Sequence, residues 1–172
     1  MTAQDTSGGP ARALSAAADG AAAFRGRLGR TYRLDARLFD RRGVAGEPAG
    51  ALTLVPLDDR RSRALRYRGR WKRAKSKRAW RNRLSRSRSR GARLTFRFRG
   101  SRVFLVGRKS RRGGRALVTL NGRRKRVSFY ARRPRNRAVV FQARVNRGGR
   151  SKLTLRVLRG RVEVDALGAL RG

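Results

Sequence analysis

The chain has 172 residues, enough for one ordinary domain with its own core, and its 49 Lys and Arg against 9 Asp and Glu give a formal net charge of +40. Cysteine and histidine are absent, which excludes disulfides, thiolate nucleophiles, Cys or His metal sites and imidazole-based catalytic triads. No stretch approaches the roughly 20 apolar residues of a membrane-spanning helix, and the charge predicts a polyanionic partner.

The positive charge is concentrated in one part of the chain. Residues 1–59 are nearly neutral, whereas residues 60–162 contain 34 Arg and six Lys and no acid. This shift predicts a domain boundary near Pro56 to Arg60. Arginine forks suit bidentate contacts with phosphate or sulfate. A GC-rich genome, which raises Arg, Ala and Gly together, is an alternative explanation of the excess of Arg over Lys.

The N-terminal part predicts a flexible arm followed by a β-hairpin. Residues 1–24 are rich in small residues and lack the early basic cluster of a signal peptide. Apolar and polar residues then alternate over 32–38, residues 43–50 form a glycine-containing loop, and 51–55 form a second strand that ends at Pro56. Residues 25–59 are therefore expected to form a hairpin, which is too small to be a stable sheet alone.

The basic region shows strand patterns at regular spacing. Leu65, Tyr67 and Trp71 alternate with Arg, residues 80–91 form a polar Ser/Arg-rich connection, and residues 92–99 alternate most clearly. An apolar run at 103–106, a basic glycine loop at 107–114, a hairpin around Asn121-Gly122 and three further strands follow. The last three strands are expected at 138–145, 153–158 and 162–167.

This pattern predicts an all-β protein in which residues 60–172 form an antiparallel β-sandwich of the jelly-roll kind. No interval shows helical periodicity. The residues expected inside the sandwich are Leu94, Phe96, Phe98, Val118, Val140, Leu155 and Val164.

The order of several short motifs resembles a known family. The Trp71 segment, GARLTFRFRG, VFLVG, the glycine loop, RALVTLNG, VSFYA, AVVFQARV, GG with LTLRV, and VEVDALGAL together resemble a galactose-binding-like jelly-roll module. Such modules lie at the C-terminal end of exported bacterial multidomain proteins. In the penultimate strand Gly149 and Leu153 match the family, but Ser151 stands where the family usually has His. The resemblance implies a non-catalytic module that binds glycans or packs beside its neighbours.

The preceding segment, GRTYRLDARLFDRRGVAGEPAGALTLVP, resembles the last two strands of a fibronectin type III or immunoglobulin-like domain. Because only those two strands are present, we expect the chain to be part of a longer multidomain protein. The alternative is that the hairpin packs against the module that follows it.

Aromatic and glycine-rich segments supply the candidate ligand-binding residues. Tyr67, Trp71, Trp80 and Tyr130 are candidates for a sugar-stacking platform, although such residues more often pack in a core or at a sheet edge. Glycine lets backbone N–H groups approach an anion, so the basic glycine loop is a candidate anion contact as well as a hairpin loop. In the segment 107–115, which extends this loop by one residue, the arginines expected to contact ligand are Arg108, Arg111, Arg112 and Arg115.

The two acids Glu163 and Asp165 have a spacing that places both on one strand face. They are weak candidates for a Ca²⁺ site, because Ca²⁺ takes several oxygen ligands. Pairing with Arg on a neighbouring strand or capping a turn is the expected alternative. A two-carboxylate glycosidase site is disfavoured, because no apolar pocket pattern accompanies the pair. No cofactor is expected.

The sequence thus predicts a non-catalytic module, secreted or at the cell surface, that binds polysaccharide or another anionic polymer. The alternative is a cytoplasmic protein that binds nucleic acid without sequence specificity, and the Ser/Arg stretch 81–90 is typical of flexible segments that fold on nucleic acid. An enzyme is disfavoured because residues for general acid and base catalysis are nearly lacking.

Overall fold

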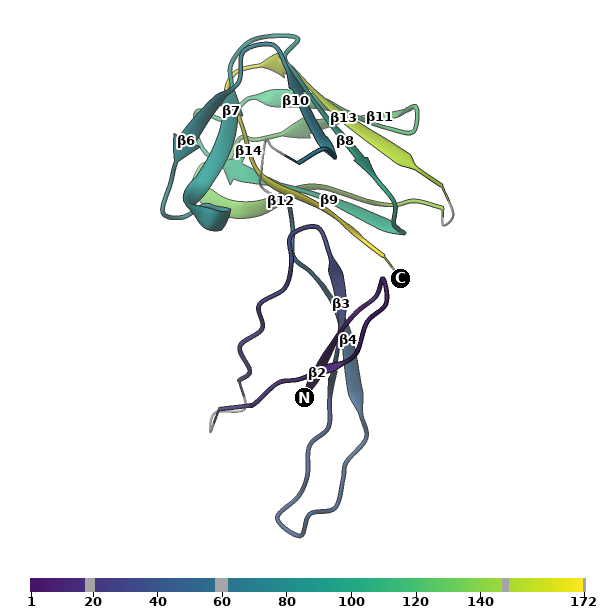
Figure 1. Ribbon diagram of the computed structural model, residues 1–172. Coiled ribbons are helices and arrows are strands. Elements are labelled where there is room, and N and C mark those ends of the chain that lie inside the picture. The colour runs from purple at the N-terminus through teal and green to yellow at the C-terminus, as the bar shows by residue number, and fades with distance from the viewer. Residues whose placement is uncertain (18–20, 58–61, 147–148, 172) are drawn as a thin grey trace. The chain divides into compact units, whose positions relative to one another are not determined.

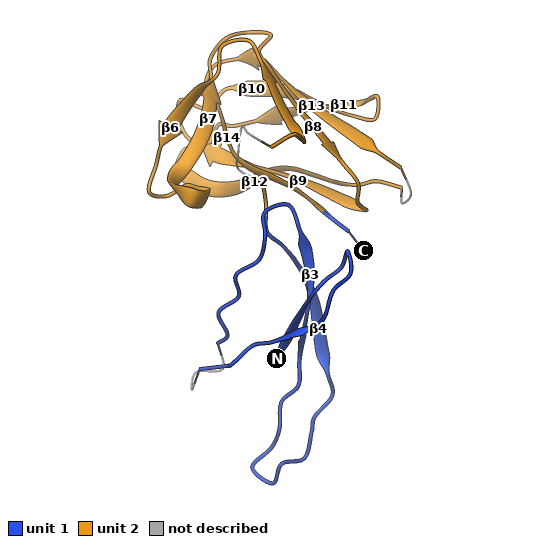
Figure 2. Ribbon diagram, in the orientation of Figure 1, with its two compact units in different colours: residues 1–55, 170–172 blue, residues 56–169 orange. Residues whose placement is uncertain are grey.

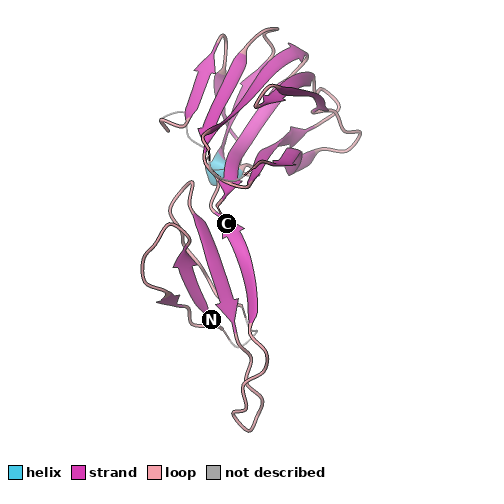
Figure 3. Cartoon of the chain, turned by 90° about the vertical axis from the view of Figure 1, so that its right-hand side faces the viewer, coloured by secondary structure: helices cyan, strands magenta, loops and turns pink. Residues whose placement is uncertain are grey.

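The computed structural model describes residues 1–17, 21–57, 62–146 and 149–171. It divides between Val55 and Pro56 into two compact units, one of residues 1–55 with the C-terminal residues from Leu170, the other of residues 56–169 (Figure 2). Apart from one 3-10 turn at Trp80–Asn82, the regular elements of the described residues are strands (Figure 3). None of the helical residues described meets the length and apolar character of a membrane span.

The first unit is a four-stranded antiparallel sheet in the order β2-β1-β3-β4. The expected hairpin is present as β3 and β4, but the arm expected over residues 1–24 contributes two further short strands. Ala3 is buried and lies opposite Leu34. A small residue such as Ala gives little hydropathy signal, so this pairing is not visible in the sequence. Residues 18–20 of the arm and 58–59 of the hairpin segment lie outside the described residues. The strands are β1 Thr2–Asp5, β2 Arg12–Ala13, β3 Thr31–Ala36 and β4 Ala49–Leu54.

The second unit is a sandwich of two five-stranded antiparallel sheets, which form two layers in Figure 1. We call them the β13 sheet, of order β11-β10-β13-β8-β5, and the β14 sheet, of order β12-β9-β14-β7-β6. The strands are β5 Leu65–Arg68, β6 Lys72–Lys75, β7 Arg83–Ser87, β8 Arg93–Phe98, β9 Arg102–Lys109, β10 Arg115–Leu120, β11 Arg123–Ser128, β12 Arg135–Arg144, β13 Ser151–Arg159 and β14 Val162–Leu170.

Strands β7 to β14 follow the chain path of a jelly roll. In one sheet the neighbouring strands are β8, β13, β10 and β11, and in the other they are β7, β14, β9 and β12. The last two strands of the chain, β13 and β14, therefore each lie between two earlier strands. The all-β sandwich predicted from the alternating pattern is therefore confirmed.

The core lies between the two sheets and is formed by the inward residues of each strand. The stacked rings of Phe96 and Phe98, whose centroids are 5.0 Å apart, lie in it together with Leu153 and Leu155 of β13. Of the residues expected inside, Val140 is half-buried and packs against the core, and the others are buried: Leu94, Phe96, Phe98, Val118, Leu155 and Val164.

The alternation expected over Leu65, Tyr67 and Trp71 is interrupted after Arg68, and the strand expected at 127–131 ends at Ser128. Two other segments also differ from the sequence expectation. The polar connection expected at residues 80–91 contains strand β7, where Ser85 and Ser87 point toward the interior and are buried. Serine and arginine do not alternate in hydropathy as apolar and charged residues do, so the strand was not recognised. The glycine loop expected at residues 107–114 is shorter, because β9 continues to Lys109. Gly107 lies within this strand, where a Cβ would be 2.5 Å from the Glu163 carbonyl oxygen and a larger residue would force a shift.

Candidate anion-binding site

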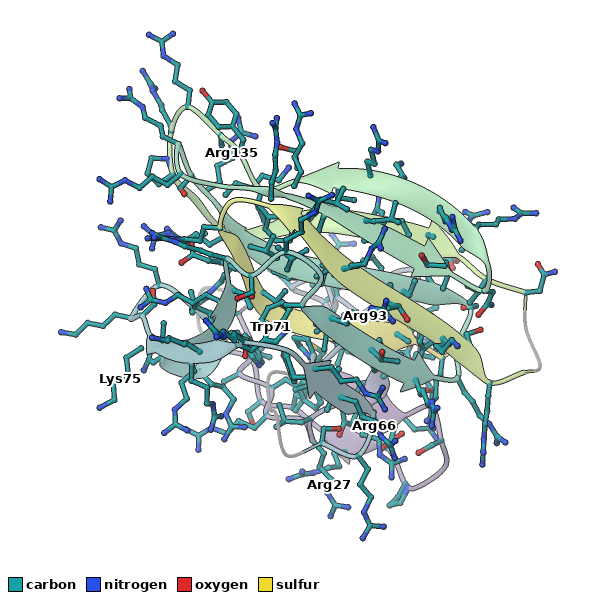
Figure 4. All side chains as sticks on the ribbon, turned by 90° about the horizontal axis from the view of Figure 1, so that it is seen from above. Arg27, Arg66, Trp71, Lys75, Arg93 and Arg135 are labelled. Carbon is teal, nitrogen blue, oxygen red and sulfur yellow. The ribbon has the colours of Figure 1, made fainter. Side chains whose placement is uncertain are left out.

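Every second connection of the sandwich lies at the same end. The strands are antiparallel and the chain runs along one strand and back along the next, so the connections at 69–71, 88–92, 110–114, 129–134 and 160–161 all fall at one end. We call these five connections the arginine end, because each of them contains at least one arginine. In Figure 4, Arg135 marks the start of the strand that leaves it.

Backbone hydrogen bonds join these connections to one another. Gly114 N–H donates to the Arg161 carbonyl at 2.6 Å, and Ser110 N–H donates to the Phe129 carbonyl at 3.0 Å. The Ser87 hydroxyl donates to the Arg70 carbonyl at 2.6 Å, and thereby holds the β5–β6 connection against β7. The end of the sandwich is therefore a fixed frame for the side chains that project from it.

Two of the pockets at the arginine end share one arginine, and the described residues that line them include no acid. The first, of about 300 Å³, lies beside β6 and β7, and the second, of about 440 Å³, lies between the β9–β10 and β11–β12 connections. Arg161 lines both of them. The first is lined by Arg70, Lys72, Arg86, Ser87, Arg88, Ser89 and Arg161, and the second by Arg108, Ser110, Arg111, Arg112, Arg132, Arg133, Pro134 and Arg161.

The positive charge of Arg161 is partly buried and lies beside the positive charges of other arginines. Burial lowers the pKa of Arg161, and the neighbouring Arg88 lowers it further, while Glu163 acts in the opposite direction. The Nε atoms of Arg161 and Arg108 are buried and have no hydrogen-bond partner among the described residues. Unpaired guanidinium donors next to like charges favour an anion, which would satisfy the donors and offset the repulsion.

The arginines predicted from the sequence are only partly brought together. Arg108, Arg111 and Arg112 line the second pocket, as the anion-contact hypothesis requires. Arg115, in contrast, lies on β10 opposite Arg159 and lines neither pocket. Glycine in the loop allows the backbone to pack closely, because a Cβ on Gly113 would overlap the Phe129 carbonyl.

The aromatic residues do not form one stacking platform. Trp71 is only 8% exposed and packs edge-on against Tyr67, with centroids 5.2 Å apart, so its ring belongs to the core. Trp80 is half-buried in the 3-10 turn of the β6–β7 connection and lines neither pocket. Tyr130 is 56% exposed and lines an adjoining hollow together with Arg111. Of the predicted platform residues, Tyr130 is therefore the one whose side chain is exposed beside the arginine pockets.

The two C-terminal acids are buried within the β14 sheet. Asp165 accepts a 2.8 Å hydrogen bond from the Trp80 N–H and so caps the turn, one of the two roles expected as alternatives to a metal site. Glu163 lies opposite Arg86 on β7. The described residues contain no group of three or more metal-ligating side chains around them.

Several pocket residues were missed from the sequence, above all Arg161, which follows a single glycine after β13. Motif reasoning selects residues next to conspicuous glycine runs, and these arginines stand in short connections without such a signal. Counting alternate connections would have found them, since each lies in or beside a connection at the same end of an antiparallel sandwich. They are Arg70, Lys72, Arg86, Arg88, Arg132, Arg133 and Arg161.

No protein-family model and no curated protein matches the chain. Solved structures that match part of the chain include a xanthan lyase from Paenibacillus, with 9% identity and a TM-score of 0.46 over 62% of this chain and 12% of that one. A two-domain esterase active on acetylated mannans has 10% identity and a TM-score of 0.47 over 69% of this chain and 36% of that one. The Agl-KA catalytic domain has 14% identity and a TM-score of 0.44, with coverages of 60% and 26%. The chain thus spans only a minor part of each of these proteins.

Proposed function

We propose that this protein is a non-catalytic module that binds acidic polysaccharide through the arginine end of its sandwich. The observation that carries the proposal is Arg161, whose unpaired Nε and cationic neighbours lie between two pockets without acidic lining. A polymer with carboxylate or sulfate groups at intervals would place one group in each pocket. Arginine forks would bind these groups in a bidentate manner.

The chemistry of the pockets supports binding rather than turnover. Their linings contain arginine, lysine, serine and proline, none of which acts as a general base near neutral pH without a partner. A serine nucleophile requires an adjacent base, and none lines these pockets. Glu163 and Asp165 are at most 4% exposed and are therefore withdrawn from the solvent-accessible pocket surface.

In this proposal the sandwich is a module of the galactose-binding-like type that works outside the cell, where acidic glycans are exposed. The motif order from the Trp71 segment to the last strand supports this assignment. The arginine-rich surface favours recognition of charged sugars over neutral ones. Non-specific binding of nucleic acid in the cytoplasm is the alternative, favoured by the net charge of +40 alone.

The test compares Arg161→Gln with Arg83→Gln, an exposed arginine of β7 that lines neither pocket. Affinity for a linear polyuronate, a neutral glucan and duplex DNA is measured at several salt concentrations. We expect Arg161→Gln to weaken polyuronate binding by about tenfold, because it removes hydrogen bonds to a charged group. Arg83→Gln should show only a small, salt-dependent loss.

A second variant, Arg112→Gln, removes an exposed arginine of the second pocket and avoids any folding defect caused by changing the half-buried Arg161. Equal losses in the pocket variants and in Arg83→Gln would refute the arginine end as the site. Tighter binding to duplex DNA than to polyuronate, at every salt concentration, would favour the alternative function.

A further inference from the structure

A second cationic surface covers the outer face of the β13 sheet, beside the arginine end but outside its two arginine pockets. Figure 4 looks onto this face, with Arg93 near its centre and Arg66 at its edge strand. The face is exposed, and residues 62–162 of the sequence contain no acid that could neutralise it.

The register of the strands arranges this face in rows that run across the sheet. Thr119, Thr154 and Thr95 lie directly opposite one another on β10, β13 and β8, and all three are half-buried. On one side of these threonines the next row places Leu117, Arg156, Arg93 and Arg68 in register, and on the other side lie Lys152 and Arg97. We call this arrangement the threonine trough, with Thr119, Thr154 and Thr95 as its floor.

The cations beside the floor repel one another in the free protein. Arg93 and Arg156 are directly opposite, so their Cβ atoms are about 4.5–5.5 Å apart, and like charges at this position destabilise a sheet. Both side chains are exposed and therefore free to turn toward a ligand. A line of negative charges along the trough would convert this repulsion into attraction.

The dimensions of the trough select among polyanions. The rows that contain Arg93 and Arg97 are four residues apart on one strand, which is about 13 Å. A single polymer chain fits between these rows, whereas a duplex is wider than the trough, because its major groove alone takes up about 12 Å and its two backbones add to this width. Proteins that bind single-stranded nucleic acid supply aromatic rings for base stacking. The described residues of this face include none.

We propose that the threonine trough binds one chain of an acidic polysaccharide lying across the strands. Threonine hydroxyls donate and accept hydrogen bonds with sugar hydroxyls, while the flanking arginines bind the acidic groups. The inference rests on the proposed function for the class of polymer, but it adds a separate surface on a different face of the sandwich.

The decisive comparison uses two double variants of the full chain. Arg93→Gln with Arg156→Gln removes a cross-strand pair of like charges from the trough. Lys75→Gln with Arg83→Gln removes an equivalent exposed pair, also directly opposite, from β6 and β7 of the other sheet. Each double variant removes two positive charges and the repulsion between them, so neither should have a lower melting temperature than the wild type.

Binding of a linear polyuronate and of single-stranded DNA is measured against salt concentration for both double variants. We expect the trough variant to bind polyuronate about tenfold more weakly than the matched control, with a salt slope lower by about two. Thr154→Val keeps the charge and the β-branched shape, and should also weaken polyuronate binding while leaving binding of single-stranded DNA unchanged.

The outcomes separate this inference from the proposed function. Equal affinities for polyuronate in the two double variants, together with a loss in Arg161→Gln, would refute the trough and leave the arginine end intact. A larger loss for single-stranded DNA than for polyuronate in the trough variant would assign the trough to nucleic acid. A wild type that fails to bind polyuronate would refute both proposals.

Discussion

At the scale of single residues, backbone segments of the arginine end pack so closely that some positions accept only glycine. Gly114 is buried, and a Cβ there would overlap the Arg159 carbonyl and crowd the backbone of Gly160 and Arg161. These contacts involve backbone atoms, which cannot move aside as a flexible side chain can. Gly114 also donates its N–H to the Arg161 carbonyl. This close packing therefore helps to position Arg161, which lines both pockets.

Gly114→Ala is therefore expected to lower the free energy of unfolding by about 1–3 kcal/mol, as overpacking does. Chemical denaturation monitored by tryptophan fluorescence measures the change. Gly149→Ala is the matched control, because no atom lies within 4 Å of a Cβ at that position. If both variants were equally stable, the close approach at Gly114 would not constrain the fold.

The pKa of the Asp5 carboxyl group can be used to test a local hydrogen bond. The hydroxyl of Ser7 and then its N–H, at 2.7 and 2.9 Å, donate to this carboxylate and hold the pKa of Asp5 below its usual value. Because the folded-state pKa is lowered, Asp5 stabilises the folded state above its unfolded pKa. This contribution is lost as the pH falls through the folded-state pKa.

Ser7→Ala is expected to raise the pKa of Asp5 toward its usual value, which NMR titration of the side-chain carboxyl carbon measures. Ser7→Thr keeps the hydroxyl and should retain the low pKa. A pKa unchanged in Ser7→Ala would show that the hydroxyl does not control this carboxylate.

At the scale of elements, the β10–β11 hairpin shows how local sequence fixes a local structure. Asn121 and Gly122 have φ values of 46° and 87°, as a two-residue turn between twisted strands requires. The Asn121 side chain accepts the Lys152 N–H at 3.0 Å and donates to the Ser151 hydroxyl at 3.1 Å. The turn therefore also fixes the start of β13, which carries part of the threonine trough.

Gly122→Ala is expected to cost about 1 kcal/mol of stability, since L-residues other than Asn and Asp rarely adopt a positive φ. Thermal unfolding followed by circular dichroism measures the loss. Gly122→Asn, which tolerates this conformation better, should recover part of it. Equal melting temperatures for the wild type and Gly122→Ala would contradict the turn geometry.

At the scale of the whole molecule, charge rather than packing distinguishes this protein from an ordinary sandwich. The core is complete, with buried residues from both sheets, yet the surface of the second unit consists largely of arginine. The Debye length falls from about 10 Å at 0.1 M salt to about 3 Å at 1 M, so added salt screens repulsion between neighbouring arginines. Net self-repulsion of this kind lowers the stability of the compact state.

The melting temperature is therefore expected to rise with sodium chloride concentration, and to rise further with polyuronate at equal ionic strength because a bound ligand stabilises the folded state. Scanning calorimetry across salt concentrations measures both effects. The double variant Arg93→Gln with Arg156→Gln should show a weaker dependence on salt. A melting temperature that falls as salt increases would mean that attractive rather than repulsive surface charges dominate.

The sequence alone determined those features that depend on neighbours along one strand. The alternation at Leu94, Phe96 and Phe98 and the Asn-Gly turn at residue 121 predicted strands, buried faces and a hairpin correctly, because inward and outward positions alternate with a period of two. Strand β7 escaped recognition because its inward residues include Ser85 and Ser87, whose burial depends on the partner strands.

Only the tertiary structure decided which cations act together. Arg70, Arg88 and Arg161 are far apart in sequence and meet in one pocket because alternate connections of an antiparallel sandwich share an end. The threonine trough likewise depends on the register between β10, β13 and β8, which places three threonines in one row. Such pairing is non-local, so no periodicity within a single strand encodes it, whereas the net charge, from which we infer an anionic partner, is a property of composition alone.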